Sequence, residues 1–292
     1  MFTANDVKEL REKTGAGMLD CKKALDATSG NMEEAISWLR EKGISKALKK
    51  ATRIAAEGLT EALCDGNVAA IIEVNCETDF VARNDEFKNL LSKVIKTLLN
   101  HEAQNMEEAN ELVIDGEDMT INDAIVSLTA KIGEKISFRR FKRIVKKDDE
   151  IFGIYSHMGG RITTLVTLKG NDEEVAKDIA MHVAAMNPSY VRSSDIKEEE
   201  LEKEKEIYKE QAINEGKPAD IAAKMVEGRI KKFYKEVCLV EQPFIKNPDL
   251  SVEQYAKNAN CEIIDMVRYE VGEGMEKRNE NFAEEVRNQM NA

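Results

Sequence analysis

The chain repeats one order of predicted elements twice, and this repeat limits its fold more than any other feature. Each copy is predicted to contain a β-hairpin, two helices and a final strand. A hairpin followed by helices and one more strand forms a small antiparallel sheet backed by helices, so we expect an α+β core of two three-stranded subdomains. The expected elements are residues 59–63, 68–74, 85–99, 122–132 and 138–145, and then 151–156, 162–168, 172–186, 251–258 and 261–271.

A small helical module precedes the repeat. Residues 3–43 predict three short helices, and the third is expected to end at Gly43. A linker helix with an apolar stripe is expected over residues 44–57. The first and third helices have capping sequences, formed by Thr3 with Asp6 and by Asn31 with Glu34.

Met18 and Leu19 stand at the start of the second helix, directly after a Gly-Ala-Gly turn. That turn follows a helix and lacks a third glycine, so it does not match a dinucleotide-binding loop. An apolar pair of this kind usually belongs to the core, and a contact with a partner protein is the alternative.

The first copy of the repeat contains an insertion that the second copy lacks. Residues 76–83 separate its strand from its helix, and they include Phe80 and Val81, where a loop would ordinarily be polar. Phe80 either folds back as a lid over its own core or projects as an apolar group beside Asp79. The sequence leaves both interpretations open.

The second copy has a different insertion, between its two helices. Residues 195–215 and 219–237 predict an antiparallel helical hairpin rich in Glu and Lys. Two helices bury little apolar surface by themselves, so a second surface, such as another copy of the chain, is expected to complete the packing. Residues 276–290 predict a final amphipathic helix with Phe282 on its apolar face.

The composition and motifs argue against an enzyme, a nucleic-acid-binding protein and a membrane protein. The formal net charge of −12 is unsuited to phosphate binding, and no apolar run reaches the ~20 residues that span a bilayer. The chain has no phosphate-binding loop, metal-ligand cluster or serine elbow, so neither a cofactor nor a metal is expected. A thiol dyad of Cys21 or Cys76 with His157 has no support in the spacing. We expect a cytoplasmic binding protein with several contact surfaces.

Two long stretches resemble the signatures of bacterial translation elongation factor Ts. They are Leu10–Leu25 (LREKTGAGMLDCKKAL) and Glu73–Arg83 (EVNCETDFVAR), and shorter matches begin at His182, Gly228 and Glu241. Leu19 replaces a methionine that is frequent in the family, a change that conserves volume. The resemblance extends in order over essentially the whole chain.

The resemblance implies a guanine-nucleotide exchange factor that binds elongation factor Tu and promotes release of GDP. It also implies a domain plan with an N-terminal ubiquitin-associated-like bundle and a hairpin used for dimerisation. The implied parts are the bundle and linker helix, 1–55; the core N-subdomain, 56–146; the core C-subdomain, 147–190 and 238–272; the hairpin, 191–237; and a C-terminal module, 273–292.

The family resemblance also implies roles for individual residues. Residues Thr78, Asp79, Phe80 and Val81 match the stretch that disturbs the magnesium site of elongation factor Tu. Met18, Leu19, His157 and Phe282 match further partner contacts.

Two other functions remain as alternatives. One is an adaptor with the same bundle and an oligomerising core but no effect on a nucleotide. The other is an RNA-binding protein that would use the basic residues between Lys46 and Arg53.

Overall fold

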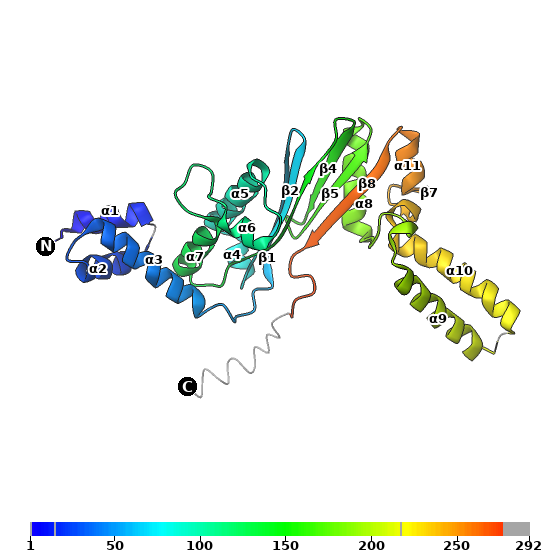
Figure 1. The fold of residues 1–292 in the computed structure, drawn as a ribbon, viewed down its shortest axis with the longest axis horizontal. Coiled ribbons are helices and arrows are strands. Elements are labelled where there is room, and N and C mark those ends of the chain that lie inside the picture. The colour runs from blue at the N-terminus through cyan, green and yellow to red at the C-terminus, as the bar shows by residue number, and fades with distance from the viewer. Residues whose placement is uncertain (1, 15, 217, 277–292) are drawn as a thin grey trace. The chain divides into compact units, whose positions relative to one another are not determined.

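The computed structural model describes residues 2–14, 16–216 and 218–276 (Figure 1). In chain order the helices are α1 (Ala4–Thr14), α2 (Met18–Ala27), α3 (Met32–Leu48), α4 (Asp79–Arg83), α5 (Asp85–Asn100), α6 (Met106–Glu111), α7 (Ile121–Ile132), α8 (Glu173–Met186), α9 (Glu198–Asn214), α10 (Ala219–Val237) and α11 (Val252–Asn258). The strands are β1 (Glu57–Asp65), β2 (Val68–Cys76), β3 (Ser137–Val145), β4 (Glu150–His157), β5 (Ile162–Lys169), β6 (Pro243–Phe244), β7 (Asn247–Ser251) and β8 (Glu262–Glu270).

Both copies of the repeat are confirmed. One sheet has the order β1-β2-β3 and the other has the order β4-β5-β8, so each contains a hairpin and a later strand. The turn between β1 and β2 contains Gly66, whose positive φ of 55° suits a tight hairpin. The α+β class is therefore confirmed, while α4, α6 and the short β6–β7 pair were not predicted.

The chain divides into two compact units. The first contains residues up to Glu61, residues 72–141 and the segment from Glu270 onward, and the second contains residues 62–71 and 142–269. None of the helices in the described ranges is long and apolar enough to cross a lipid bilayer.

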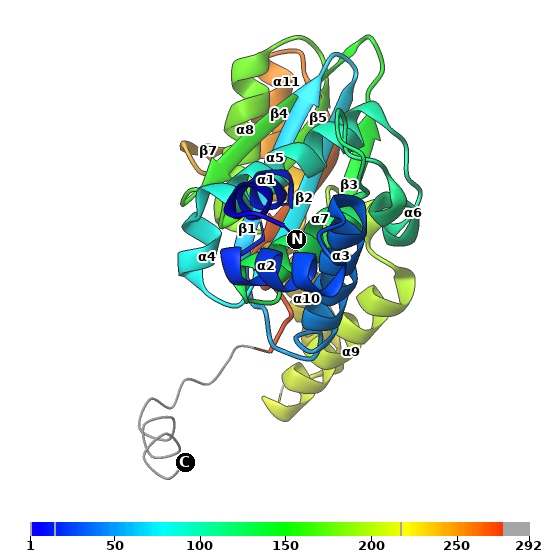
Figure 2. The same cartoon turned by 90° about the vertical axis from the view of Figure 1, so that its left-hand side faces the viewer.

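The N-terminal helices α1–α3 form a bundle in the first unit (Figure 2). Their shared core contains Leu10, Cys21 and Leu25, each fully buried. The predicted cap of α1 is present, since the Asp6 carboxylate accepts hydrogen bonds from the Thr3 backbone N–H (2.6 Å) and hydroxyl (2.8 Å). These bonds lower the pKa of Asp6 below its ordinary value.

The separate linker helix predicted over residues 44–57 is wrong. Helix α3 continues through Gly43 to Leu48, turns follow, and β1 begins at Glu57. Gly43 is buried, and a Cβ there would lie 3.6 Å from the Ala130 Cβ of α7. Glycine inside a helix costs about 1 kcal/mol, yet α3 continues through this position, where it packs on α7.

A buried carboxylate joins the segment after β8 to β2 and β3. Glu73 of β2 is fully buried and pairs with Arg139 (2.9 Å) and Arg140 (2.6 Å) of β3. It also accepts hydrogen bonds from the Gly272 N–H (2.9 Å) and the Asn75 amide (3.0 Å). Burial opposes ionisation, but these bonds and charges outweigh it and lower the pKa of Glu73.

The second unit has two apolar clusters. In one, α8 covers β4 and β5, with Val166, Ile179 and Val183 in the interior. In the other, the outer part of β2 packs against β5 and β8 through Ile71, Leu165 and Val267. Strand β2 is consequently buried along almost its whole length, which explains its continuous apolar run.

Strand β4 approaches α8 so closely that only glycine fits at one position. A Cβ at Gly153 would lie 2.2 Å from the Ala176 carbonyl oxygen, a backbone atom that cannot rotate away. We expect Gly153→Ala to lower the free energy of unfolding by about 2–3 kcal/mol in urea titrations. As a control, Gly228→Ala in α10 meets no atom within 4 Å and should raise stability by up to about 1 kcal/mol. An unchanged stability of Gly153→Ala would contradict the close packing.

His182 makes the second unit sensitive to acid. The ring is fully buried in α8, where Nδ1 accepts from the Ile245 N–H (3.2 Å) and Nε2 donates to Gln242 Oε1 (2.9 Å). Burial lowers the pKa of His182, although the bond to Gln242 opposes the shift. The folded protein therefore holds a neutral imidazole at pH values where the unfolded chain is protonated.

We expect the free energy of unfolding to fall as the pH drops below about 6.5, because the unfolded chain then gains a proton that buried His182 does not. This one group contributes a slope of at most about 1.4 kcal/mol per pH unit. Urea titrations between pH 7.5 and 5 should show that His182→Gln flattens the slope relative to the wild type. Equal slopes in the two proteins would contradict this role of His182.

Candidate partner-binding site

Helix α4 presents one large apolar side chain to solvent. Phe80 is 81% exposed, whereas its neighbours Val81 and Ala82 are buried. The interpretation of Phe80 as a lid over its own core is therefore wrong, and the projecting interpretation agrees with the structure. Within one helical turn, Val81 and Ala82 thus anchor α4, and Phe80 is exposed to solvent.

The four residues of the predicted Thr78–Val81 stretch differ in where they lie. Thr78 is the N-cap of α4, and its hydroxyl accepts a hydrogen bond from the Val81 N–H (3.4 Å). Asp79 is half-exposed and pairs with Arg83 one turn later (2.9 Å). An exposed pair of this kind is worth at most about 1 kcal/mol, so a partner could replace it at little cost. Of the four residues, Phe80 is exposed, Thr78 and Asp79 are half-buried, and Val81 is buried.

The carboxylates of Glu134 and Glu77 accept hydrogen bonds at the start of α4. Glu134 accepts hydrogen bonds from the Thr78 N–H (3.0 Å) and from the Thr78 hydroxyl (2.8 Å). The Glu77 carboxylate accepts from the Lys135 N–H (2.6 Å) and pairs with Arg53 (3.3 Å). Glu134 was not predicted from the sequence, because 56 residues separate it from Thr78 and no local pattern connects them.

Met18 and Leu19 form a second exposed apolar group, in the first turn of α2. Met18 is 57% exposed and Leu19 is 75% exposed, so the interpretation as core residues is wrong. Asp20, which follows them, pairs with Lys46 near the end of α3 (2.8 Å). This ion pair joins the first turn of α2 to the last turns of α3.

His157 lies at the exposed end of β4, in the second unit. Its Nδ1 is 3.3 Å from the Tyr155 hydroxyl. Met158 follows in the turn with a positive φ of 50° and is 69% exposed, a feature that sequence analysis missed. A methionine before two glycines in a hairpin turn was the available signal. Phe282 and most of the 273–292 module lie outside the described residues.

The two thiols considered for a dyad with His157 lie in environments that favour their protonated form. Burial, together with Glu134 and Glu57, raises the pKa of the Cys76 thiol to about 12, and burial also raises the pKa of Cys21. Both thiols are therefore protonated at neutral pH and poor nucleophiles. Within the described part of the chain, no group of three or more His, Cys, Asp or Glu side chains is arranged to hold a metal ion.

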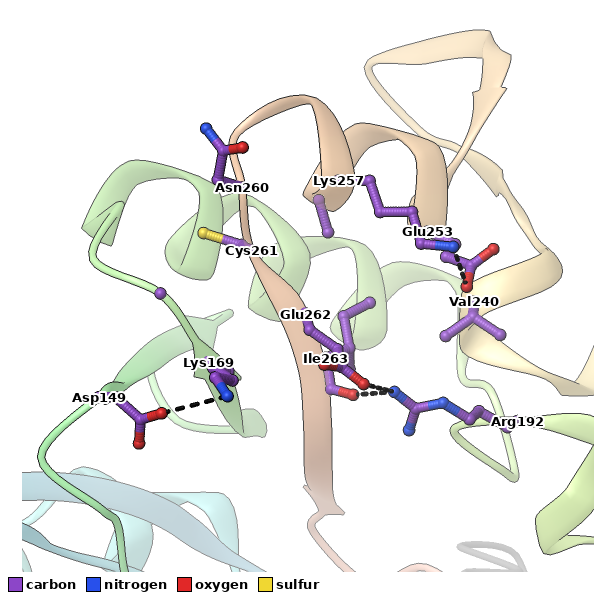
Figure 3. Close-up of a pocket in the computed structure, with 12 residues that line it drawn as sticks. Asp149, Lys169, Arg192, Val240, Glu253, Lys257, Asn260, Cys261, Glu262 and Ile263 are labelled. Carbon is purple, nitrogen blue, oxygen red and sulfur yellow. Dashed lines mark hydrogen bonds and ion pairs between the residues drawn. The ribbon is translucent and has the colours of Figure 1, made fainter.

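A pocket of about 690 Å³ lies in the second unit, beside α11 and the start of β8 (Figure 3). Its charged side chains neutralise one another in three ion pairs: Asp149 with Lys169 (3.3 Å), Arg192 with Glu262 (3.3 Å) and Glu253 with Lys257 (2.8 Å). Each charged side chain that lines the pocket therefore already has a partner within the protein.

Comparison with known protein families identifies one match that covers α4. A family model described as elongation factor TS matches residues 77–273, which is about two-thirds of the 292-residue chain. The match begins at Glu77, includes Phe80, strand β3 of the first sheet and all three strands of the second sheet, and extends to the segment after β8. The chain is a member of the elongation factor Ts family.

Proposed function

We propose that this protein releases GDP from elongation factor Tu by inserting the Phe80 ring between helices of its partner. Members of its family are nucleotide exchange factors for elongation factor Tu in translation elongation, and we place this activity in the cytoplasm. The observation that carries the mechanism is the 81% exposed Phe80 on an anchored helix. A large apolar group held in water gains free energy when a partner buries it.

The insertion would act on the magnesium and phosphate site of the partner. Movement of the helices that hold these groups loosens them, and the Asp79 carboxylate adds negative charge beside the opening. The exchange factor forms no covalent bond, so its action is differential binding to the nucleotide-free partner. Reciprocity then requires GDP to weaken binding of this protein by the same factor.

The energetics require more than one contact. Burying a phenylalanine side chain supplies about 2–3 kcal/mol, and a tenfold change in affinity takes about 1.4 kcal/mol. Large acceleration therefore needs further contacts, which we assign to Met18, Leu19, His157 and Phe282. The exposure of Met18, Leu19 and His157 supports this assignment.

The alternatives have less support. An adaptor without exchange activity gives no reason for an exposed aromatic ring on an anchored helix. RNA binding through residues 46–53 is opposed by ion pairs, since Lys46 pairs with Asp20 and Arg53 pairs with Glu77. We expect no nucleic-acid partner.

Phe80→Ala is expected to slow GDP release from elongation factor Tu by at least about tenfold, because the variant loses most of the buried apolar surface. Release of labelled GDP at saturating exchange factor measures the effect. Val113→Ala, which truncates another exposed apolar residue of the first unit, is the matched control and should match the wild type. Wild-type release by Phe80→Ala would contradict the insertion mechanism.

The helical hairpin is our proposed surface for a homodimer. Its inner positions include Ala212 and Ile230, whereas Ile213 and Ile221 are exposed near its tip. Helix α9 carries seven glutamates and three lysines, and α10 carries five basic and three acidic residues. A second hairpin can therefore bury the isoleucines. It can also place the acidic α9 of one copy beside the basic α10 of the other, so that opposite charges meet.

We expect the double variant Ile213→Asp and Ile221→Asp to convert the dimer to a monomer, because two buried charges would be unpaired in the interface. Sedimentation velocity at micromolar concentration measures the change. Val145→Asp introduces a charge at another exposed position, on β3, and should leave the dimer intact. A monomeric wild-type protein would contradict the proposed dimer.

A further inference from the structure

Two neighbouring pairs of residues exchange carboxylate-to-backbone hydrogen bonds beneath α4. The Glu134 carboxylate binds the N–H of Thr78, and the Glu77 carboxylate binds the N–H of Lys135. We call these four residues, Glu77, Thr78, Glu134 and Lys135, the carboxylate clamp. Each segment supplies one acceptor side chain and one backbone donor, so the segments fix each other's position.

Helix α4 depends on such support because it is only five residues long. Nucleating a helix fixes several backbone torsions for a single hydrogen bond, so an isolated helix of this length is unstable. The helix can gain stability from its buried side, Val81 and Ala82, and from its N-cap. The N-cap is Thr78, the residue that Glu134 holds by two hydrogen bonds.

The other side of the clamp is itself fixed. Gly133 ends α7 with a positive φ of 89°, and Glu134 follows it directly. On the far side of the clamp, the Ile136 N–H donates to the Thr129 hydroxyl of α7 (3.2 Å). The Lys135 ammonium also donates to the Arg53 carbonyl oxygen (3.0 Å), so three segments of the first unit meet here.

We propose that Glu134 and Glu77 are positioning residues of the exchange reaction, which hold α4 so that Phe80 reaches the partner as a rigid group. This inference rests on the proposed function of Phe80. A rigid ring arrives at its partner without the loss of backbone entropy that ordering a mobile loop would cost. Both residues act through α4 and need not touch elongation factor Tu.

The test combines Glu134 variants with Phe80→Ala. Glu134→Ala removes both acceptors from Thr78, and Glu134→Gln keeps one side-chain oxygen in the same shape. Losing the hydrogen bonds that Thr78 donates to Glu134 costs about 1 kcal/mol, so Glu134→Ala should slow GDP release about fivefold at saturating concentration. Glu134→Gln should fall between Glu134→Ala and the wild type.

The double variant separates positioning from a direct contact. If Glu134 acts through Phe80, Glu134→Ala should add little to the defect of Phe80→Ala. Hydrogen exchange of the free protein provides a second measurement, because the Val81, Ala82 and Asn84 amides donate to groups within residues 78–81. Exchange at these amides should accelerate in Glu134→Ala, while the amides of α5 stay protected.

Asp123→Ala is the matched control. Asp123 accepts a backbone hydrogen bond from Thr120 at the opposite end of α7, and it also pairs with Arg40. Its loss should lower the stability of the first unit without changing exchange at α4. Unchanged GDP release by Glu134→Ala, or an equal loss with and without the Phe80 ring, would overturn the clamp as a positioning device. The proposed function of Phe80 would survive either result and would fall only if Phe80→Ala itself had no effect.

Discussion

An exposed aromatic ring can push groups of a partner apart only if the backbone that carries it is fixed. A helix of five residues, such as α4, is not stable without support from the rest of the protein. Most features of the first unit around α4 serve this constraint. Val81 and Ala82 are buried below the helix, Thr78 caps it, and Glu134 fixes the cap. Phe80 itself stays exposed above this anchored backbone.

Carboxylates are used in the same way elsewhere in this acidic protein. Glu73 accepts from the Gly272 N–H while it neutralises Arg139 and Arg140, so it joins β2, β3 and the segment after β8. Two basic residues of β3, Arg139 and Arg140, thus share an internal partner. A buried ionised carboxylate is tolerated here because several donors replace the water it loses.

The two repeats use one scaffold for different purposes. Both have a hairpin, a helix on the sheet and a returning strand, but the first inserts α4 after its hairpin and the second inserts α9 and α10 after α8. Each insertion exposes apolar groups, Phe80 in one and Ile213 with Ile221 in the other. A regular sheet and its helices fix the ends of an insertion, which lets the insertion itself carry a contact surface.

Local chemistry in the sequence was enough to predict both sheets, most of the helices and the caps at Thr3 and Asn31, because periodicity, capping and turn formation involve residues a few positions apart. The same local patterns predicted that a helix ends at Gly43, but α3 packs on α7 there and continues to Leu48. It recognised the importance of Phe80 but could not decide its direction, since that depends on Glu134, a residue 56 positions from Thr78. Only the tertiary structure brings such distant groups together, and the orientation of a side chain on a short inserted helix is decided by them.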